Sequence, residues 1–351
     1  MAFRTLDSVL LVLLLLNAVC QRARGFSCVA SKNPLSPARS HQTHQLFVSS
    51  SPESNDSSII HLPHLVVLIP AYNEEFRITE TLESYSNYLS SSNRWKHQSS
   101  IMVANDGSTD DTYRVVEKVV STLPIPIDCV SLPTNGGKGA ALAYGIQEIV
   151  RRSNSSNNDR PTVILTTDAD GSAPADGIDA MYDKLVSHWE SSAVSQNENA
   201  AKVLIGKKLR NEPVVVAGIR TYESAAPSRL IFRWGFRTVV RLVCGNLNVN
   251  DSQCGFKMFT IPAATLLYQD LNLPGWSHDV EVLYRAKRLG IKVLEQETEW
   301  EDKEGSKLVA TPGGVILVSA KMLVEVIRLR LGYEQGGWKL PPYSPGAKTK
   351  D

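Results

Sequence analysis

Two carboxylates lie one residue apart in the segment PTVILTTDADGS (161–172). Asp168 and Asp170 follow a continuous apolar run at 163–165, which is typical of a buried parallel strand. Strand alternation directs both carboxylates to one face, and the small Ala169 between them takes little room. Open α/β sheets bind ligands at the carboxyl ends of their strands, and paired hard oxygen ligands suit Mg²⁺ or Mn²⁺ holding a diphosphate. The pair alone is weak evidence, because acidic residues often lie solvated at strand ends.

Polar residues also follow two other apolar runs. In IPAYNEE (69–75), Pro70 ends a strand, Tyr72 lies in the turn and Glu74 opens a helix. The acidic residues could simply complement the helix dipole, or the turn could form a nucleotide pocket with Tyr72 against a base. In NDGSTDD (105–111), Asp106 stands at a strand tip, where it could accept a hydrogen bond from the N3–H of uracil. A common turn would explain the same residues.

The segment TNGGKGAA (134–141) joins glycines to a lysine. It fails the pattern of a nucleotide-triphosphate loop, because Lys138 is followed by Gly139 and not by serine or threonine. Its glycines still permit a close backbone approach, and Lys138 near a helix N-terminus favours phosphate oxygens.

Alternating strands and helices must position these residues. Strand patterns occur at 65–69, 101–105, 126–131, 163–165, 214–218 and 291–296, and helix patterns at 75–92, 109–121, 137–151, 174–188, 228–244 and 279–289. Repeated strand–helix units of this spacing predict an α/β fold with a doubly wound, mostly parallel sheet. Polar stretches at 152–160 and about 190–202 are interpreted as surface insertions.

Composition excludes several classes of protein. The 351 residues carry a net charge of +1, so no nucleic-acid partner is expected. The five cysteines are scattered, odd in number and never in a CxxC pattern, which argues against a disulfide framework or a zinc site and for a reducing compartment.

The N-terminal region differs in composition from the rest. Residues 9–20 form an apolar run shorter than the ~20 residues of a spanning helix, so 1–25 is either a cleaved signal peptide or a signal anchor whose basic downstream flank keeps the chain in the cytosol. A Ser-rich linker at 26–60 also resembles an organelle-targeting presequence. We expect a catalytic domain at 61–335 and a flexible tail at 336–351.

In this order, IPAYNEE, NDGST, NGGKGAA and DADGS resemble the nucleotide-binding half of glycosyltransferase family 2, which has the A-type glycosyltransferase fold. The later segments AGIRTYESAAPSRLIFRWGF, DSQCGFKMF, GWSHDVEVLYRAKRLG and WEDKEGSKL are similar to those of the dolichyl-phosphate β-glucosyltransferase branch. The resemblance covers about residues 61–335.

The resemblance implies an enzyme that transfers glucose from UDP-glucose to dolichyl phosphate with inversion, for N-glycan assembly. It further implies an endoplasmic-reticulum membrane location and a Mg²⁺ or Mn²⁺ cofactor on Asp168 and Asp170. The basic flank after the apolar run and the cysteine usage predict that the catalytic domain faces the cytosol. Asp279 and Asp170 are the implied catalytic residues. The donor would contact Pro70, Tyr72, Glu74, Asp106, Lys138 and Asp168, and the acceptor phosphate would contact Arg220, Arg229, Lys257 and Lys307.

Three alternatives remain at this stage. The chain could be a dolichyl-phosphate mannosyltransferase, another family 2 transferase with a protein or polysaccharide acceptor, or a nucleotide-sugar-binding protein without turnover. Residues 314–331 are apolar but interrupted by charge, which favours a buried or interfacial amphipathic helix suited to delivering a polyprenyl acceptor. A plain packing helix would show the same pattern.

Overall fold

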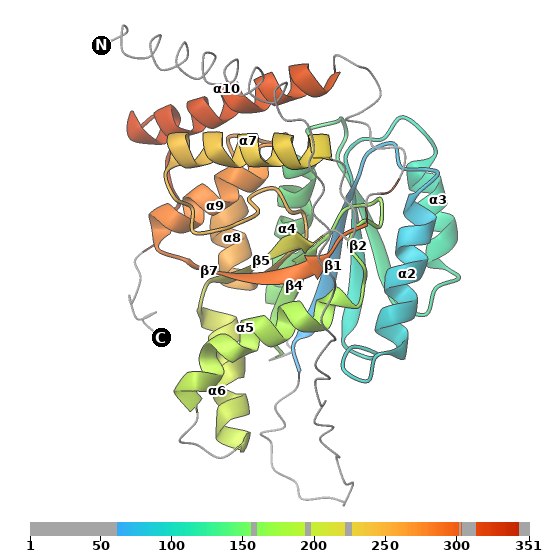
Figure 1. Cartoon of the computed structure of the whole chain (residues 1–351). Coiled ribbons are helices and arrows are strands. Elements are labelled where there is room, and N and C mark those ends of the chain that lie inside the picture. Colours follow the sequence, from blue (N-terminus) through green and yellow to red (C-terminus); the bar gives the residue numbers. More distant parts are fainter. Residues whose placement is uncertain are drawn as a thin grey trace, which may run out of the picture. The chain divides into compact units, whose positions relative to one another are not determined.

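The computed structural model describes residues 62–155, 160–193, 198–221, 227–301, 303 and 314–343 (Figure 1). Its strands are β1 (His64–Ala71), β2 (Ser99–Asn105), β3 (Ile127–Ser131), β4 (Thr162–Thr166), β5 (Val214–Thr221), β6 (Lys257–Thr260) and β7 (Lys292–Glu299). Its helices are α2 (Ile78–Ser91), α3 (Thr112–Val120), α4 (Lys138–Ser155), α5 (Gly177–Ala193), α6 (Glu198–Asn211), α7 (Pro227–Cys244), α8 (Ile261–Tyr268), α9 (His278–Leu289) and α10 (Gly314–Glu334).

The strands form one sheet in the order β3-β2-β1-β4-β6-β5-β7. All neighbouring pairs are parallel except those of β6, which runs antiparallel to β4 and β5. The predicted doubly wound, mostly parallel sheet is therefore confirmed. Its carboxyl edge collects the turns after β1, β2 and β4, because parallel strands end on the same side.

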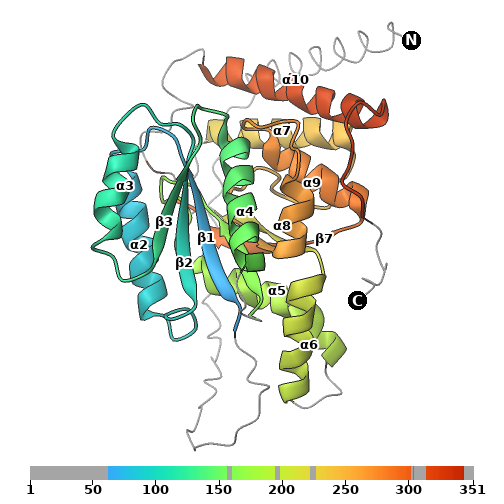
Figure 2. The same ribbon diagram turned by 180° about the vertical axis from the view of Figure 1, so that it is seen from behind.

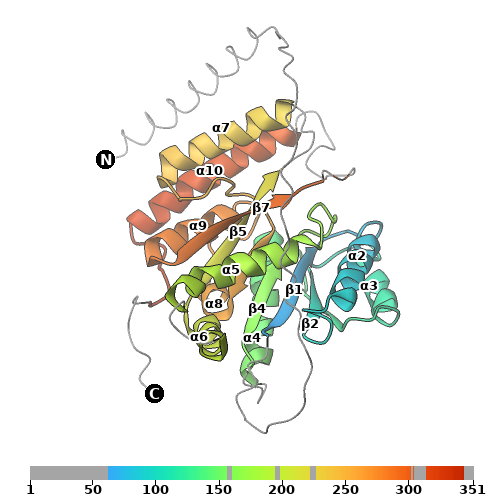
Figure 3. The same ribbon diagram turned by 60° about the horizontal axis from the view of Figure 1, so that its bottom comes forward.

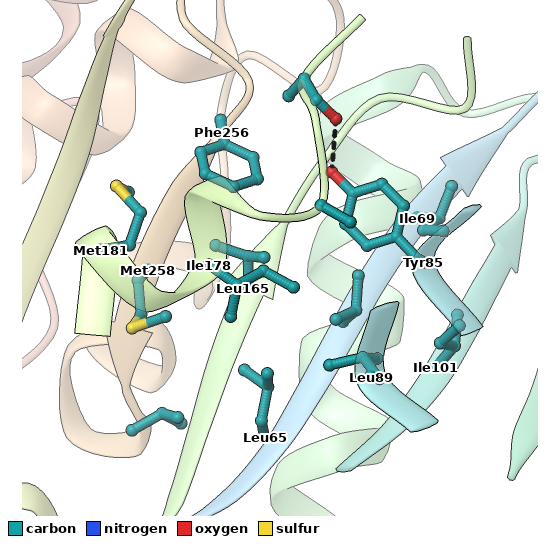
Figure 4. Packing of buried hydrophobic residues seen from close by; sticks show 14 of the residues in the cluster. Leu65, Ile69, Tyr85, Leu89, Ile101, Leu165, Ile178, Met181, Phe256 and Met258 are labelled. Carbon is teal, nitrogen blue, oxygen red and sulfur yellow. Dashed lines mark hydrogen bonds between the residues drawn. The ribbon is translucent and has the colours of Figure 1, made fainter. Parts of the chain in front are cut away.

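Helices cover both faces of the sheet. Side chains of α2, α3 and α5 pack with β1 and β4 on one face, and Figure 4 shows part of this core around Leu65, Leu165, Ile178 and Met258. Side chains of α4, α8 and α9 pack on the other face, which Figure 2 brings forward. Each strand of the sheet's centre is buried on both faces, which explains the continuous apolar runs in the sequence.

A third apolar cluster joins α7, α9 and α10. Val240 of α7, Leu283 of α9 and Val326 and Leu329 of α10 are buried together. Figure 3 shows α7 and α10 lying side by side. The buried positions of α10 recur at helical spacing while Arg328 and Arg330 are exposed, so the helix is amphipathic. Among the described residues, the structure contains no helix that is both long and apolar enough to cross a membrane.

Two parts of the chain differ from expectation. The predicted insertion near 190–202 overlaps the end of α5 and the start of α6. The first residues of the predicted flexible tail pack on the fold: the Trp338 ring lies 5.6 Å from that of Tyr333, and Leu340 contacts the core. Residues 1–61 and 344–351 lie outside the described part.

Candidate active site

The acidic turn, residues 167–173, follows β4, which lies in the middle of the sheet. The Asp168 and Asp170 side chains are partly exposed there. Gly171 has a φ of 69°, and the Ser172 N–H donates to Asp170 Oδ1 at 3.1 Å. The turn therefore brings both carboxylates to the carboxyl edge of the sheet.

Lys138, the first residue of α4, meets Asp168. Its Nζ lies 2.5 Å from Asp168 Oδ1 and 5.7 Å from the centre of the half-exposed Trp276 ring. Burial acts to lower the pKa of Lys138, but Asp168, Asp279 and Asp170 hold it above its ordinary value. The predicted glycine–lysine segment and the predicted acidic pair thus lie in one place.

Asp106 holds the backbone of the glycine segment. Its carboxylate accepts hydrogen bonds from the N–H groups of Gly136 (2.8 Å) and Gly137 (2.9 Å) and from Asn135 Nδ2 (3.0 Å). Burial raises the pKa of Asp106 against the lowering effect of the two backbone bonds. The structure gives Asp106, expected to meet uracil, a position that shapes the turn before Lys138.

The turn after β1 is fastened to the turn after β2. The Asn73 N–H donates to Ser108 Oγ at 3.0 Å, and Asn73 Oδ1 accepts from the Thr109 N–H at 2.8 Å. Pro70 pairs with Ala104 in the sheet, and 37% of Tyr72 is exposed beside it.

Glu74, expected to contact the donor, forms an ion pair within its own turn. Its carboxylate accepts two hydrogen bonds from the Arg77 guanidinium, both 2.8 Å long. The Glu74 backbone N–H donates to Thr112 Oγ1 at 2.7 Å, so the residue also joins the start of α2 to α3.

Asp279 lies in the first turn of α9 with a buried lysine against it. Lys257 Nζ is 2.5 Å from Asp279 Oδ1, and the same amine donates to the Cys254 carbonyl. Lys257 is fully buried and Asp279 is 5% exposed. Burial alone would raise the pKa of Asp279, but His278, Lys257 and Lys138 hold it below its ordinary value. Burial lowers the pKa of His278, and the neighbouring Asp279 opposes this shift.

Two close backbone approaches bring Asp279 to the acidic turn. A Cβ on Gly139 would lie 2.5 Å from His278 Cβ, and the Ala140 N–H donates to the Pro274 carbonyl at 3.1 Å, so α4 and α9 begin side by side. A Cβ on Gly255 would lie 2.6 Å from Asp168 Oδ1. The QCGFK segment therefore contacts Asp168 through Gly255 and Asp279 through Lys257, a double role that its sequence did not reveal.

The cationic residues expected at the acceptor phosphate lie in different surroundings. Arg220 forms a two-point ion pair with Asp251, at 2.7 and 2.9 Å, and lies over the Trp300 ring. Lys257 is fully buried and forms an ion pair with Asp279. Arg229 lies in α7, where its side chain is not described, and Lys307 lies outside the described residues.

The residues present fit a cation that is completed by its substrate. Within the described ranges, no group of three or more His, Cys, Asp or Glu side chains could hold a metal. Asp168 and Asp170 supply hard oxygen ligands only, which suits a divalent cation that takes its remaining ligands from a diphosphate and water.

Comparison with known proteins identifies relatives of this chain. The profile of Glycosyl transferase family 2 matches residues 66–250. A dolichyl-phosphate beta-glucosyltransferase of Trichomonas vaginalis is 30% identical, with 79% of this chain and 76% of that protein aligned. The dolichyl-phosphate beta-glucosyltransferase of Mus musculus is 30% identical over 89% of each chain. Glucosyl-3-phosphoglycerate synthase of Mycobacterium tuberculosis, solved with Mn²⁺ and UDP, has a TM-score of 0.47 at 16% identity, covering 77% of this chain and 80% of that one.

The fold and the family match define a nucleotide-sugar glycosyltransferase of family 2. Within that family, this chain belongs to the dolichyl-phosphate beta-glucosyltransferases.

Proposed function

We propose that this protein transfers glucose from UDP-glucose to dolichyl phosphate with inversion, giving dolichyl phosphate glucose and UDP. The observation that carries the proposal is the meeting of two lysine–carboxylate pairs at one edge of the sheet, Lys138 with Asp168 and Lys257 with Asp279. The family membership agrees with this reaction. The first pair belongs to the donor side and the second to the acceptor side.

The chemistry of the acceptor explains the state of Asp279. A phosphate monoester has a second pKa of about 6, so its oxygen is largely ionised at neutral pH and needs little help from a base. Asp279 has a lowered pKa and is therefore a weak base. We assign it the positioning of the acceptor through a cation, and Arg229 of α7 and Lys307 remain the proposed phosphate contacts.

The donor side must compensate the negative charge of departing UDP. A divalent cation held by Asp168 and Asp170 would supply Lewis-acid neutralisation of the diphosphate when bound. Lys138 adds a positive charge beside Asp168, in a largely buried position where charge interactions are screened less than in water. Tyr72 and Pro70 are the proposed nucleoside contacts, and Trp276 beside Lys138 borders the same region.

The proposed membrane location rests on the proposed acceptor, which is a lipid. We propose that residues 1–25 anchor the chain to the endoplasmic-reticulum membrane and that the catalytic domain faces the cytosol. Cys129, Cys244 and Cys254 are free thiols, which is in keeping with a reducing compartment. The exposed arginines of α10 suit an anionic membrane surface.

The test is incorporation of radiolabelled glucose into a lipid extract. Full-length protein in detergent, given labelled UDP-glucose, dolichyl phosphate and Mn²⁺ or Mg²⁺, should transfer label to the organic phase. Omission of dolichyl phosphate should abolish that transfer. Label that stays in water with wild-type protein, under every metal tried, contradicts the proposal.

A further inference from the structure

Helix α2 directs two buried hydroxyl groups at the acidic turn. Thr81 Oγ1 donates to the Ala169 carbonyl at 2.8 Å, and Tyr85 OH donates to the Ala173 carbonyl at 2.8 Å. Tyr85 OH also shares a 2.9 Å hydrogen bond with Thr167 Oγ1. Thr81 and Tyr85 are 2% and 1% exposed, and their spacing of four residues places them on one face of the helix. Figure 4 shows Tyr85 reaching the turn from α2.

These bonds span the part of the chain that carries the carboxylates. Thr167 precedes Asp168, Ala169 separates the two acids, and Ala173 lies at the end of the turn. Hydrogen bonds from α2 therefore hold the chain before, between and after Asp168 and Asp170. The segment between β4 and α5 is irregular, and Gly171 within it has a positive φ. A Cβ on Gly171 would lie 3.2 Å from Thr81 Oγ1, which shows how closely the turn lies on α2.

We propose that Thr81 and Tyr85 are positioning residues that hold the turn at 167–173 in the geometry with which Asp168 and Asp170 bind a divalent cation. The proposal rests on the metal role given to these carboxylates in the proposed function. Groups that orient metal ligands determine affinity without touching the metal, and loss of a hydrogen bond made directly to a ligand typically weakens metal binding by about 10–100-fold. Thr81 and Tyr85 act one step further out, on the backbone that carries the ligands, so we expect the lower end of this range. Burial raises the pKa of Tyr85, so its hydroxyl remains a donor throughout the usable pH range.

The same helix provides a matched control. Tyr88 lies on α2 and donates its hydroxyl to Asp179 Oδ2 of α5 at 2.9 Å, away from the acidic turn. Tyr88→Phe therefore removes a tyrosine hydroxyl bond of the same helix, as Tyr85→Phe does, but leaves the turn untouched. Thr81→Val removes a hydroxyl with little change of volume, and Thr81→Ser keeps the hydroxyl and should restore the wild-type behaviour.

The experiment measures Mn²⁺ binding to the full-length protein with UDP present, from the paramagnetic resonance signal of free Mn²⁺. Thr81→Val and Tyr85→Phe should raise the Mn²⁺ dissociation constant about tenfold or more, whereas Tyr88→Phe and Thr81→Ser should stay near wild type. Hydrogen exchange without metal should speed up at 167–173 in the first two variants only. The melting temperature of each variant shows whether it is folded.

The outcomes separate this proposal from the proposed function. Wild-type Mn²⁺ affinity in both Thr81→Val and Tyr85→Phe overturns it, as does an equal loss in Tyr88→Phe or a wild-type protein that binds no Mn²⁺. Amide hydrogen exchange measures the opening of residues 167–173 and needs no sugar substrate. Faster exchange in a protein that does not use UDP-glucose would therefore contradict the proposed reaction while leaving the anchoring intact.

Discussion

The two lysine–carboxylate pairs differ in how far they are exposed to solvent. The Lys138 and Asp168 side chains are 14% and 24% exposed, while those of Lys257 and Asp279 are 0% and 7% exposed. A partly exposed pair can exchange its partner for an incoming cation or diphosphate at modest cost, whereas separating an enclosed pair leaves a buried charge without compensation. We therefore expect Asp168 to be the adaptable carboxylate and Asp279 the fixed one.

Replacing Asp170 by Asn should remove activity and leave the fold intact. An amide oxygen can still accept the Ser172 N–H bond, but the ligand charge is lost at the tip of β4. Loss of a metal-binding carboxylate should cost several kcal/mol in the transition state, which corresponds to roughly 100-fold or more in rate. Turnover assays and thermal melts check this. Metal-dependent turnover close to wild type would contradict the assignment.

Replacing Lys257 by Met should destabilise the protein by about 3–5 kcal/mol, because Asp279 keeps a buried charge. Chemical denaturation measures the loss, and the double variant Lys257→Met/Asp279→Asn should recover part of it. Lys287→Met is the control. Lys287 lies on a more exposed part of α9, and its amine makes only a weak hydrogen bond, 3.2 Å long, to the Cys244 carbonyl. Equal destabilisation by both single changes would refute the ion-pair interpretation.

The same pair gives a stability that depends on pH. A carboxylate whose folded pKa is lowered stabilises the fold above its unfolded pKa of about 4, and this contribution is lost as the pH falls through the folded value. The difference in unfolding free energy between wild type and Lys257→Met should therefore be largest at neutral pH and shrink toward acid. A difference that grows below pH ~4 would show that Asp279 is not the charged partner.

At the scale of residues, the sequence predicts which groups can do chemistry better than where their partners lie. Asp168 and Asp170 follow an apolar run, and this position alone predicts the strand tip. The hydroxyls of Thr81 and Tyr85 sit in an ordinary amphipathic helix, and only the packed structure shows that they meet the acidic turn. Lys257 has the residue type of a phosphate ligand, but antiparallel pairing of β6 encloses it.

Close packing of α4 on α9 is the main determinant of the site at the scale of elements. Gly139 allows the two helix starts to meet, and this contact brings Lys138 toward Asp279. Gly139→Ala should destabilise the protein by about 1–3 kcal/mol and reduce turnover, because its Cβ would overlap His278. Gly206→Ala in α6, whose Cβ would have no neighbour nearer than 3.8 Å, should be neutral or stabilising by up to about 1 kcal/mol. Denaturant unfolding measures the stability of both variants. A Gly139→Ala variant as stable as Gly206→Ala would contradict the close approach of α4 to α9.

Most elements could be predicted from periodicity, and the exceptions have physical causes. β1, β2, β4 and β5 were predicted by their buried runs, and α5 begins three residues late because Pro174 and Ala175 form a turn before it. β6 has only four residues, all buried, which is too short for any period to appear. α6 was missed because charged and polar residues interrupt its apolar ones and because it joins a polar stretch.

The orientation of the whole molecule is open to a simple test. Three glycosylation sequons begin at Asn55, Asn154 and Asn250, and Asn154 and Asn250 are exposed. If the catalytic domain faces the cytosol, protein made with endoplasmic-reticulum membranes should show no mobility shift on glycosidase treatment. A shift that disappears when Asn55 and Asn154 are changed to Gln would show a lumenal domain and a cleaved signal at 1–25.

The central claim concerns the sugar that this site moves and the lipid that receives it. The most direct measurement is a competition between equal concentrations of UDP-glucose and GDP-mannose, each carrying a different label, with dolichyl phosphate and the full-length protein. Asp170→Asn, which should keep the fold, serves as the inactive control. The account predicts that glucose enters the lipid phase in large excess over mannose and that the control transfers neither sugar. Equal or greater transfer of mannose would contradict it.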